Sequence, residues 1–396
     1  MTSKNSVPFE KTFLIPLRNG LTRPKAVRGN GIKMINMGEL FAHSRIKNVQ
    51  TDRVPFTNNE QSFLLEKGDL LFARQSLVLA GAGKCSIFVD DNEAVIYEGH
   101  IIRARLNKEI ADPFFYYYFF NSSIGRQTVE GIVEQVAAAG IRGSDLAKLK
   151  IPLPPLPEQR AIAGILGALD DKIELNRRMN ATLESMARSV FRQWFVENEK
   201  VGSWKEVPLP EIIEVNPSRS LKKGEIAPYL DMANMPTQGH RGIEWIDRPF
   251  GSGTKFINGD TLLARITPCL ENGKTAFVDF LKDGQVSWGS TEYIVFRPKP
   301  PLPPEYGYYL ARSEELRSHA IQNMTGTSGR QRTPAICFNN YMVAVPPADL
   351  ANKFGEFAKS VIAKIRANDE ESRTLASLRD GLLPRLMRED VRVSEL

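Results

Sequence analysis

The sequence holds few of the residues that build metal centres, disulfide frameworks or membrane spans. Its three cysteines, Cys85, Cys269 and Cys337, lie far apart, and its four histidines are scattered. Because no CxxC pair and no Cys/His cluster occurs, we expect neither a zinc site nor disulfides. This expectation is consistent with a protein of a reducing compartment. The most apolar run, residues 113–120, is too short to span a bilayer, and no apolar signal region opens the sequence. We therefore expect a soluble, cytoplasmic protein without a metal ion or a membrane partner.

Motifs for catalysis and nucleotide binding are also missing. A P-loop would need a glycine five residues before Gly273 of the GKT segment, where the sequence has Pro268. No GxGxxG, GxSxG or HExxH motif occurs, and the nearest approach to the amino-methyltransferase tetrapeptide is NPSR at 216–219. The acidic pair Asp170-Asp171 falls on a helical stretch, and we interpret it as a solvated face. The sequence thus predicts a chain that is not itself an enzyme and binds no cofactor.

Composition places the chain among ordinary globular proteins. It has 396 residues, of which 42% are hydrophobic and 25% are charged, which leaves room for two domains and additional helices. The formal net charge is +6 and the sequence pI is about 9.1. This mild basic excess favours a polyanionic partner without identifying one.

The sequence contains a long internal repeat. The segment GDLLFAR at 68–74 returns as GDTLLAR at 259–265, and the proline pair at 154–155 returns at 346–347. A period this long is neither a solenoid nor a propeller. It indicates a duplicated unit, each copy consisting of a domain followed by a long helical stretch.

Both predicted domains are mixed α/β with short strands. Apolar or alternating runs bounded by glycine, aspartate and asparagine recur in each half, which is typical of strands. Asp112 and Pro113 are predicted to start a short helix, with Asp112 as its N-cap. We assign the aromatic run that follows to the core rather than to a base-stacking surface, because so many adjacent rings cannot all face solvent.

Two heptad seams follow the two proline pairs. Apolar positions step by threes and fours over more than four heptads, which is typical of a coiled-coil face. An asparagine interrupts both seams at the same place, and such residues often fix the register of paired helices. The predicted seam residues are Ile162, Leu169, Ile173, Asn176, Leu183 and Val190 in the first helix, and Phe354, Val361, Ile365, Asn368, Leu375 and Leu382 in the second. The fold class we expect is α+β: two mixed domains alternating with two long helices that pair as an antiparallel coiled coil with internal pseudo-twofold symmetry. The alternative is two separate amphipathic helices, each on its own domain.

Donor-rich segments recur at matching points of the two domains. One follows the repeated strand, and another precedes each proline pair. Arginine and glutamine can bind guanine and adenine edges bidentately, and small residues allow close backbone approach. Ordinary polar strand ends or flexible surface loops are the alternative interpretation. The candidate DNA contacts are Arg74, Gln75, Lys84, Arg142 and Ser144 in the first domain, and Arg265, Thr267, Lys274, Arg330, Gln331 and Arg332 in the second.

Together these segments resemble the specificity subunit of Type I restriction–modification systems. The resemblance is carried by IPLPPLPEQRAIAGILGALDDKIELNRRMNATLESMARSVFRQWF at 151–195, by SLRDGLLPRLM at 377–387, and by IIEVNPSRSLKKG and YLDMANM in the second half. The usual LPEQ after the second proline pair is replaced here by ADLA. The resemblance covers essentially the whole chain.

The resemblance implies target recognition domains at 1–152 and 201–346, and spacer helices at 153–200 and 347–396. Each recognition domain would bind one half of an asymmetric, bipartite double-stranded DNA target. The paired helices would set the spacing and dock two modification (methyltransferase) subunits, which allow restriction subunits to join. S-adenosylmethionine, ATP and Mg would be used by those partners. A methylation-only or fused system, a coiled-coil scaffold, an RNA-binding protein and an enzyme in its own right remain as alternatives.

Overall fold

The computed structural model describes residues 6–135, 139–242, 244–327 and 329–388. The chain divides into two compact units: one contains residues 1–173 and 374–396, and the other contains residues 174–373. Both divisions fall inside long helices, α5 (Leu156–Phe195) and α8 (Ala348–Met387), each of 40 residues. Each unit therefore includes its own portion of both helices.

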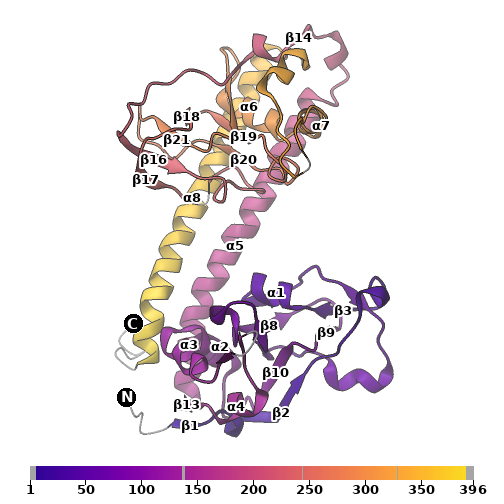
Figure 1. Ribbon diagram of the computed structural model, residues 1–396, viewed down its shortest axis with the longest axis vertical. Helices are drawn as coiled ribbons and strands as arrows, with labels where there is room; N and C mark the ends of the chain where they lie inside the picture. Colours follow the sequence, from indigo (N-terminus) through magenta and orange to yellow (C-terminus); the bar gives the residue numbers. More distant parts are fainter. Residues whose placement is uncertain (1–5, 136–138, 243, 328, 389–396) are drawn as a thin grey trace. The chain divides into compact units, whose positions relative to one another are not determined.

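The first unit is built on a five-stranded sheet with the order β2-β10-β6-β8-β4, accompanied by three smaller sheets (Figure 1). The first two small sheets are the pair β1-β13 and the ribbon β11-β12-β7, and the third has the order β5-β3-β9. Its strands are β1 (Ser6–Pro8), β2 (Phe13–Asn19), β3 (Ile32–Ile35), β4 (Arg45–Lys47), β5 (Arg53–Val54), β6 (Leu70–Ala73), β7 (Gln75–Ser76), β8 (Cys85–Asp90), β9 (Val95–Tyr97), β10 (Ile101–Leu106), β11 (Glu134–Gln135), β12 (Ala139–Gly140) and β13 (Lys150–Pro152). Its short helices are α1 (Met37–Ala42), α2 (Pro113–Asn121), α3 (Ser123–Glu130) and α4 (Gly143–Lys148).

The aromatic run forms α2 and lies in the core, as predicted. The Asp112 side chain accepts hydrogen bonds from the backbone N–H groups of Phe114 and Phe115, which caps the helix. The residues from Phe115 to Phe120 are all buried, and the rings of Phe72 and Phe120 meet edge to face with centroids 5.0 Å apart. These rings therefore join α2 to the central strand β6.

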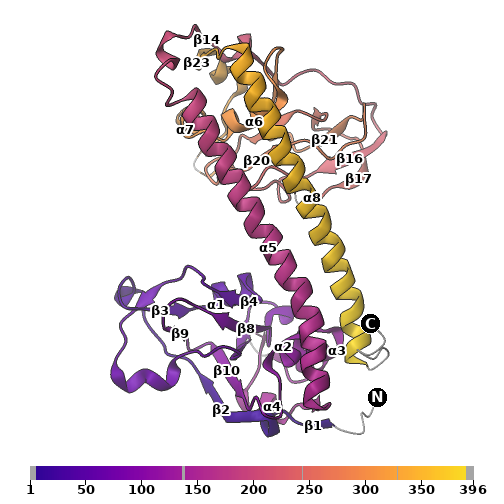
Figure 2. The same ribbon diagram turned by 180° about the vertical axis from the view of Figure 1, so that it is seen from behind.

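The second unit repeats the plan with two four-stranded sheets, β15-β22-β19-β20 and β17-β16-β21-β18. A further pair, β14-β23, is antiparallel (Figure 2). The strands are β14 (Glu206–Pro208), β15 (Ile213–Val215), β16 (Ile226–Leu230), β17 (Ile246–Pro249), β18 (Thr254–Phe256), β19 (Thr261–Ala264), β20 (Thr275–Phe277), β21 (Ser287–Gly289), β22 (Tyr293–Pro298) and β23 (Met342–Ala344). The short helices are α6 (Pro304–Ala311) and α7 (Glu314–Gln322).

Helix α5 begins at Leu156, directly after the first proline pair, and Pro157 lies inside its first turn. Proline is tolerated there because the first backbone N–H groups of a helix have no partner within the helix. Helix α8 likewise continues past Pro384 to Met387.

Within the second unit the two long helices pair antiparallel, as predicted. Asn176 Nδ2 donates to Asn368 O at 3.3 Å and to Ser372 Oγ at 3.2 Å, and Asn368 Nδ2 donates to Asn180 Oδ1 at 2.8 Å. The internal repeat matches Asn176 with Asn368 and Asn180 with Ser372. The last two bonds are therefore equivalent by the pseudo-twofold symmetry. Farther along α5, Phe191 packs against a residue nearer the start of α8, Phe354, with ring centroids 5.4 Å apart.

The predicted seam residues are buried or half-buried in the two units. In the second unit Phe354, Val361 and Ile365 are buried in the core, and Leu183 and Val190 pack against it. In the first unit, the core includes Ile162, with Leu382 packed against it. The remaining apolar seam residues are half-buried: Leu169, Ile173 and Leu375.

The interpretation of Asp170 as part of a solvated face is wrong. Asp170 is only 8% exposed, and its carboxylate accepts from the Tyr118 hydroxyl at 2.7 Å and from Arg379 Nη1 at 2.6 Å. Burial raises the pKa of Tyr118, so the hydroxyl stays protonated and donates. The neighbouring Asp171 is exposed and binds Arg45 Nη2 at 2.6 Å. Asp170 thus ties α2 and the end of α8 to α5 within the first unit.

Candidate nucleic-acid interface

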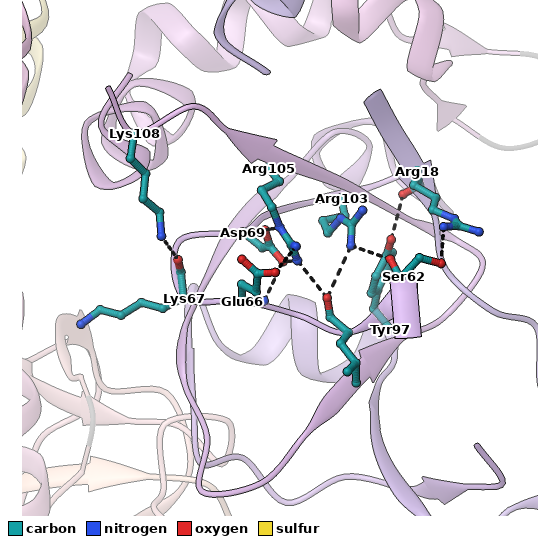
Figure 3. A network of polar contacts seen from close by, with 10 residues as sticks. Arg18, Ser62, Glu66, Lys67, Asp69, Tyr97, Arg103, Arg105 and Lys108 are labelled. Atoms are coloured by element: carbon teal, nitrogen blue, oxygen red, sulfur yellow. Dashed lines mark hydrogen bonds and ion pairs between the residues drawn. The ribbon is translucent and has the colours of Figure 1, made fainter. Parts of the chain in front are cut away.

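A buried glycine–aspartate turn anchors the start of β6 in the first unit. Gly68 has a φ of 96°, a conformation that favours glycine, and Asp69 is 1% exposed. The Asp69 carboxylate accepts from the backbone N–H of Glu66 at 2.8 Å and from Arg105 Nε and Nη2 at 2.8 and 2.7 Å. Figure 3 shows this network, including the bond from Lys108 Nζ to Lys67 O at 2.9 Å. Because the buried carboxylate has an ionic partner and a backbone donor, it fixes the strand that leads to the candidate interface.

The same turn anchors β19 in the second unit. Gly259 has a φ of 84°, and the buried Asp260 accepts from Ile257 N at 2.8 Å and from Arg297 Nε at 2.5 Å. Burial raises the pKa of Asp260 although Arg297 and Arg219 lie beside it. The repeated GD…R pattern thus marks a structural anchor at the start of each strand, and the candidate contact residues follow at its end.

In the first unit the structure joins the two donor-rich segments in one ribbon. Strand β7, which follows Arg74, pairs with β12, and β12 pairs with β11. The backbone N–H of Ile141 donates to Arg74 O at 2.9 Å. Arg74, Gln75, Arg142 and Ser144 are all exposed beside this ribbon. Residues 136–138, which belong to the predicted segment, lie outside the described residues.

The second unit forms a corresponding ribbon from its own two segments. The isolated bridge Ile266–Arg332 joins them, and Thr267 N donates to Gln331 O at 3.0 Å; the bridge Thr325–Arg332 lies within the second segment. Thr333 N donates to Arg265 O at 2.8 Å, which matches the bond between Ile141 and Arg74. The two units therefore present the candidate side chains on equivalent backbone frames.

Two glutamates that the sequence analysis missed orient arginines on these ribbons. Arg142 Nη2 lies 2.8 Å from Glu134 Oε2 in the first unit. In the second unit Glu292 binds Arg332 Nε at 2.8 Å and lies 3.6 Å from Arg265 Nε. Arg330 is exposed, whereas Gln331, Arg332, Arg265 and Thr267 are half-buried. No spacing in the sequence connects these glutamates to their arginines, because strand pairing alone brings them together.

The two candidate lysines are directed toward their own units. Lys84 Nζ donates to Phe41 O at 2.8 Å, and Lys274 Nζ donates to Met232 O at 2.5 Å. Burial lowers the pKa of Lys84, and the nearby Arg126 charge adds to this. Each amine thus has an internal acceptor, with which the phosphate contact expected from the sequence would have to compete.

The described residues contain no group of three or more His, Cys, Asp or Glu side chains that could hold a metal ion. In the same part of the chain no helix is long and apolar enough to cross a membrane. The three cysteines are free thiols.

Comparison with known proteins shows which proteins this chain is similar to. Residues 24–185 match the model of the Type I restriction modification DNA specificity domain. The chain is 24% identical over 307 residues to the Type I restriction enzyme MjaIX specificity subunit of Methanocaldococcus jannaschii, covering 71% of this chain and 70% of that protein. It is 32% identical over 163 residues to the EcoEI specificity subunit of Escherichia coli, covering 39% of this chain but only 27% of that one. The chain is therefore similar to Type I restriction–modification specificity subunits, in the first of these matches over 71% of its length.

A solved structure supports the fold over the whole length. The crystal structure of the Type I restriction–modification S subunit from M. genitalium matches with a TM-score of 0.57 at 17% identity, covering 98% of this chain and 97% of that one. At this identity the match concerns the fold alone. The repeated domain-and-helix plan is therefore shared with that protein.

Proposed function

We propose that this chain is the DNA-recognition subunit of a Type I restriction–modification complex, with one ribbon reading each half of a split double-stranded target. The observation that carries the proposal is that equivalent backbone frames in the two units display arginines and different neighbouring side chains. Arg74 is followed by Gln75 on the first frame, and Arg265 by Ile266 on the second. A shared frame with different side chains suits a bipartite target whose halves differ in sequence.

The exposed arginines and Gln75 supply the hydrogen-bonding chemistry for base recognition. An arginine can donate two parallel bonds to guanine O6 and N7, and a glutamine can pair with adenine N6 and N7. Glu134 and Glu292 restrict the rotamers of the arginines that they bind, which lowers the ordering cost of a base contact. Exposed cations nearby would add the sequence-independent attraction to phosphates.

The long helices would dock two modification subunits, which transfer the methyl group, and through them the restriction subunits. The central polar layer of Asn176 and Asn368 fits a pair with one register. Methyl transfer from S-adenosylmethionine and ATP-dependent cleavage would then belong to the partners, and this chain would contribute recognition without catalysis.

The decisive experiment maps methylated bases in cells that carry the modification subunits with and without this chain. We expect one asymmetric, bipartite motif that disappears when this chain is absent. Methyl transfer by the purified chain alone would contradict the proposal and indicate an enzyme. Absence of specific duplex binding in the presence of the modification subunits would instead indicate a scaffold or an RNA-binding protein.

A further inference from the structure

The loop after β7 in the first unit carries an apolar tip that its own unit leaves uncovered. Leu77 is 98% exposed, Val78 64% and Leu79 46%. Among the described residues no other three consecutive large aliphatic side chains are exposed. Such runs are unusual on a folded surface unless a partner covers them. The tip begins two residues after Gln75, and so continues the candidate DNA-contact ribbon.

The backbone of this tip is held firmly although its side chains project outward. Ser76 Oγ accepts from the backbone N–H of Val78 at 3.2 Å, and residues Leu79–Gly81 form a short 3₁₀ helix, η4. Arg126 Nη2, on α3, donates to Ala80 O at 3.0 Å. A Cβ atom at Gly81 would lie 2.2 Å from Ser76 Oγ, so any larger residue there would require the Ser76 side chain to move. The exposed aliphatic groups are thus presented on a fixed frame, which lowers the entropic cost of covering them.

The corresponding loop of the second unit has a different surface. Leu270, at the position that matches Leu79 when the two arginines are aligned, is 0% exposed. The exposed residues of this loop are Pro268, Glu271 and Asn272. The duplication therefore keeps the loop but gives one copy an apolar tip and the other a polar one. If the two loops served only to stabilise their own units, one would not need an exposed apolar tip where the other has a polar one.

We propose that Leu77 and Val78 read thymine by packing on its C5-methyl group in the major groove. The inference rests on the proposed function and assigns a base to the half-site of the first unit. The methyl group is the one apolar feature that a thymine presents in that groove, and aliphatic side chains without donors suit it. Arg74 and Gln75, at the base of the tip, are the side-chain types that read major-groove edges. An apolar wedge in the minor groove would instead have to offset the cost of unstacking a base step.

The test uses the full chain with its modification subunits and duplexes of the mapped target. Each thymine of the first half-site is replaced in turn by deoxyuridine, which lacks only the methyl group, and affinity is measured by fluorescence anisotropy. We expect one replacement to weaken binding by about fourfold, the effect of losing one buried methyl-sized group. The double variant Leu77→Ala, Val78→Ala should bind the thymine duplex similarly weakly and should not distinguish thymine from deoxyuridine there.

The matched control is Ile110→Ala, which removes a side chain that is 41% exposed. Ile110 lies near the opposite end of β6, where Gly68 approaches Lys108. This variant should bind as the unaltered chain does and should keep the preference for thymine.

Several results would overturn the inference while leaving the proposed function intact. These are a first half-site without thymine, equal binding of all deoxyuridine duplexes, and a double variant that still prefers thymine. Increased 2-aminopurine fluorescence at a base step that needs Leu77 would indicate a wedge, and loss of modification subunits from the double variant would indicate a protein contact. Absence of specific binding by the unaltered complex would instead refute the proposed function.

Discussion

Arg330 and Arg332 lie two positions apart, yet their surroundings differ sharply. Arg332 binds Glu292 and takes part in the strand bridges of its ribbon, whereas Arg330 is exposed and its carbonyl accepts from Arg332 Nη1 at 3.2 Å. Arg332 thus supports the backbone frame of the ribbon, whereas the exposed Arg330 is available to contact a DNA base. The two arginines should therefore respond differently to substitution.

We expect Arg330→Ala to weaken specific DNA binding by about 1–3 kcal/mol and to relax one position of one half-site, as loss of a bidentate base contact does. Binding to variant targets and methylation sequencing measure both effects. Lys282→Ala, which removes an exposed charge between β20 and β21, is the control and should not change sequence preference. A uniform loss across sequences for Arg330→Ala would mark a phosphate contact instead.

The internal bond of Lys84 makes a second prediction at the residue scale. Lys84→Met leaves Phe41 O without its donor, so we expect the free energy of unfolding to fall by about 1 kcal/mol. The slope of log affinity against log salt should stay unchanged, because the amine is committed to a carbonyl. Thermal unfolding and a salt titration test this, and a slope reduced by about 0.9 would show that Lys84 neutralises a phosphate.

At the scale of elements, Asp170 joins three helices by two hydrogen bonds, whereas Asp171 makes one exposed ion pair. We expect Asp170→Asn to lower the free energy of unfolding by about 1.5–3 kcal/mol, because it weakens buried bonds to a charged group. The adjacent Asp171→Asn is the matched control and should cost less than about 1 kcal/mol, as exposed ion pairs do. Equal losses in chemical denaturation would contradict the special role of Asp170.

The polar layer of the helix pair supports a prediction about register. Replacing both Asn176 and Asn368 by leucine should keep or raise the melting temperature, since apolar seams are more stable, while reducing the preference for one register. Amide hydrogen exchange over α5 and α8 should then show several pairings of the helices. A double variant with unchanged exchange and lower stability would mean that the asparagines act only through their hydrogen bonds.

Periodicity in the sequence predicted the elements that depend on local pattern. The seams, the aromatic core helix and the repeated strands follow from spacing and capping, so α2, α5 and α8 were found. The role of Asp170 was missed because its partners, Tyr118 and Arg379, are distant in the sequence. Glu292 and the apolar exposure of Leu77 were missed for the same reason: strand pairing and loop closure decide them. The donor-rich segments were found through their recurrence, but only the structure showed that the two in each unit meet.

At the scale of the whole molecule, the two compact units divide inside α5 and α8, between residues 173 and 174 and between 373 and 374. Inserting four helical residues, about one turn, at both points adds about 6 Å to each helix. We expect the spacer between the half-sites to change by about one or two base pairs while both half-sites stay intact. Methylation sequencing measures this, and altered half-sites with an unchanged spacer would refute it.

The glycine–aspartate turns also affect how this protein can change over time. Gly68, Asp69 and Arg105, like Gly259, Asp260 and Arg297, hold each central strand from the end opposite its ribbon. Substitutions within the ribbon loops that directly follow Arg74 and Arg265 leave these anchors untouched. The chain can therefore acquire a new target by altering a few short loops, without first having to evolve a new fold.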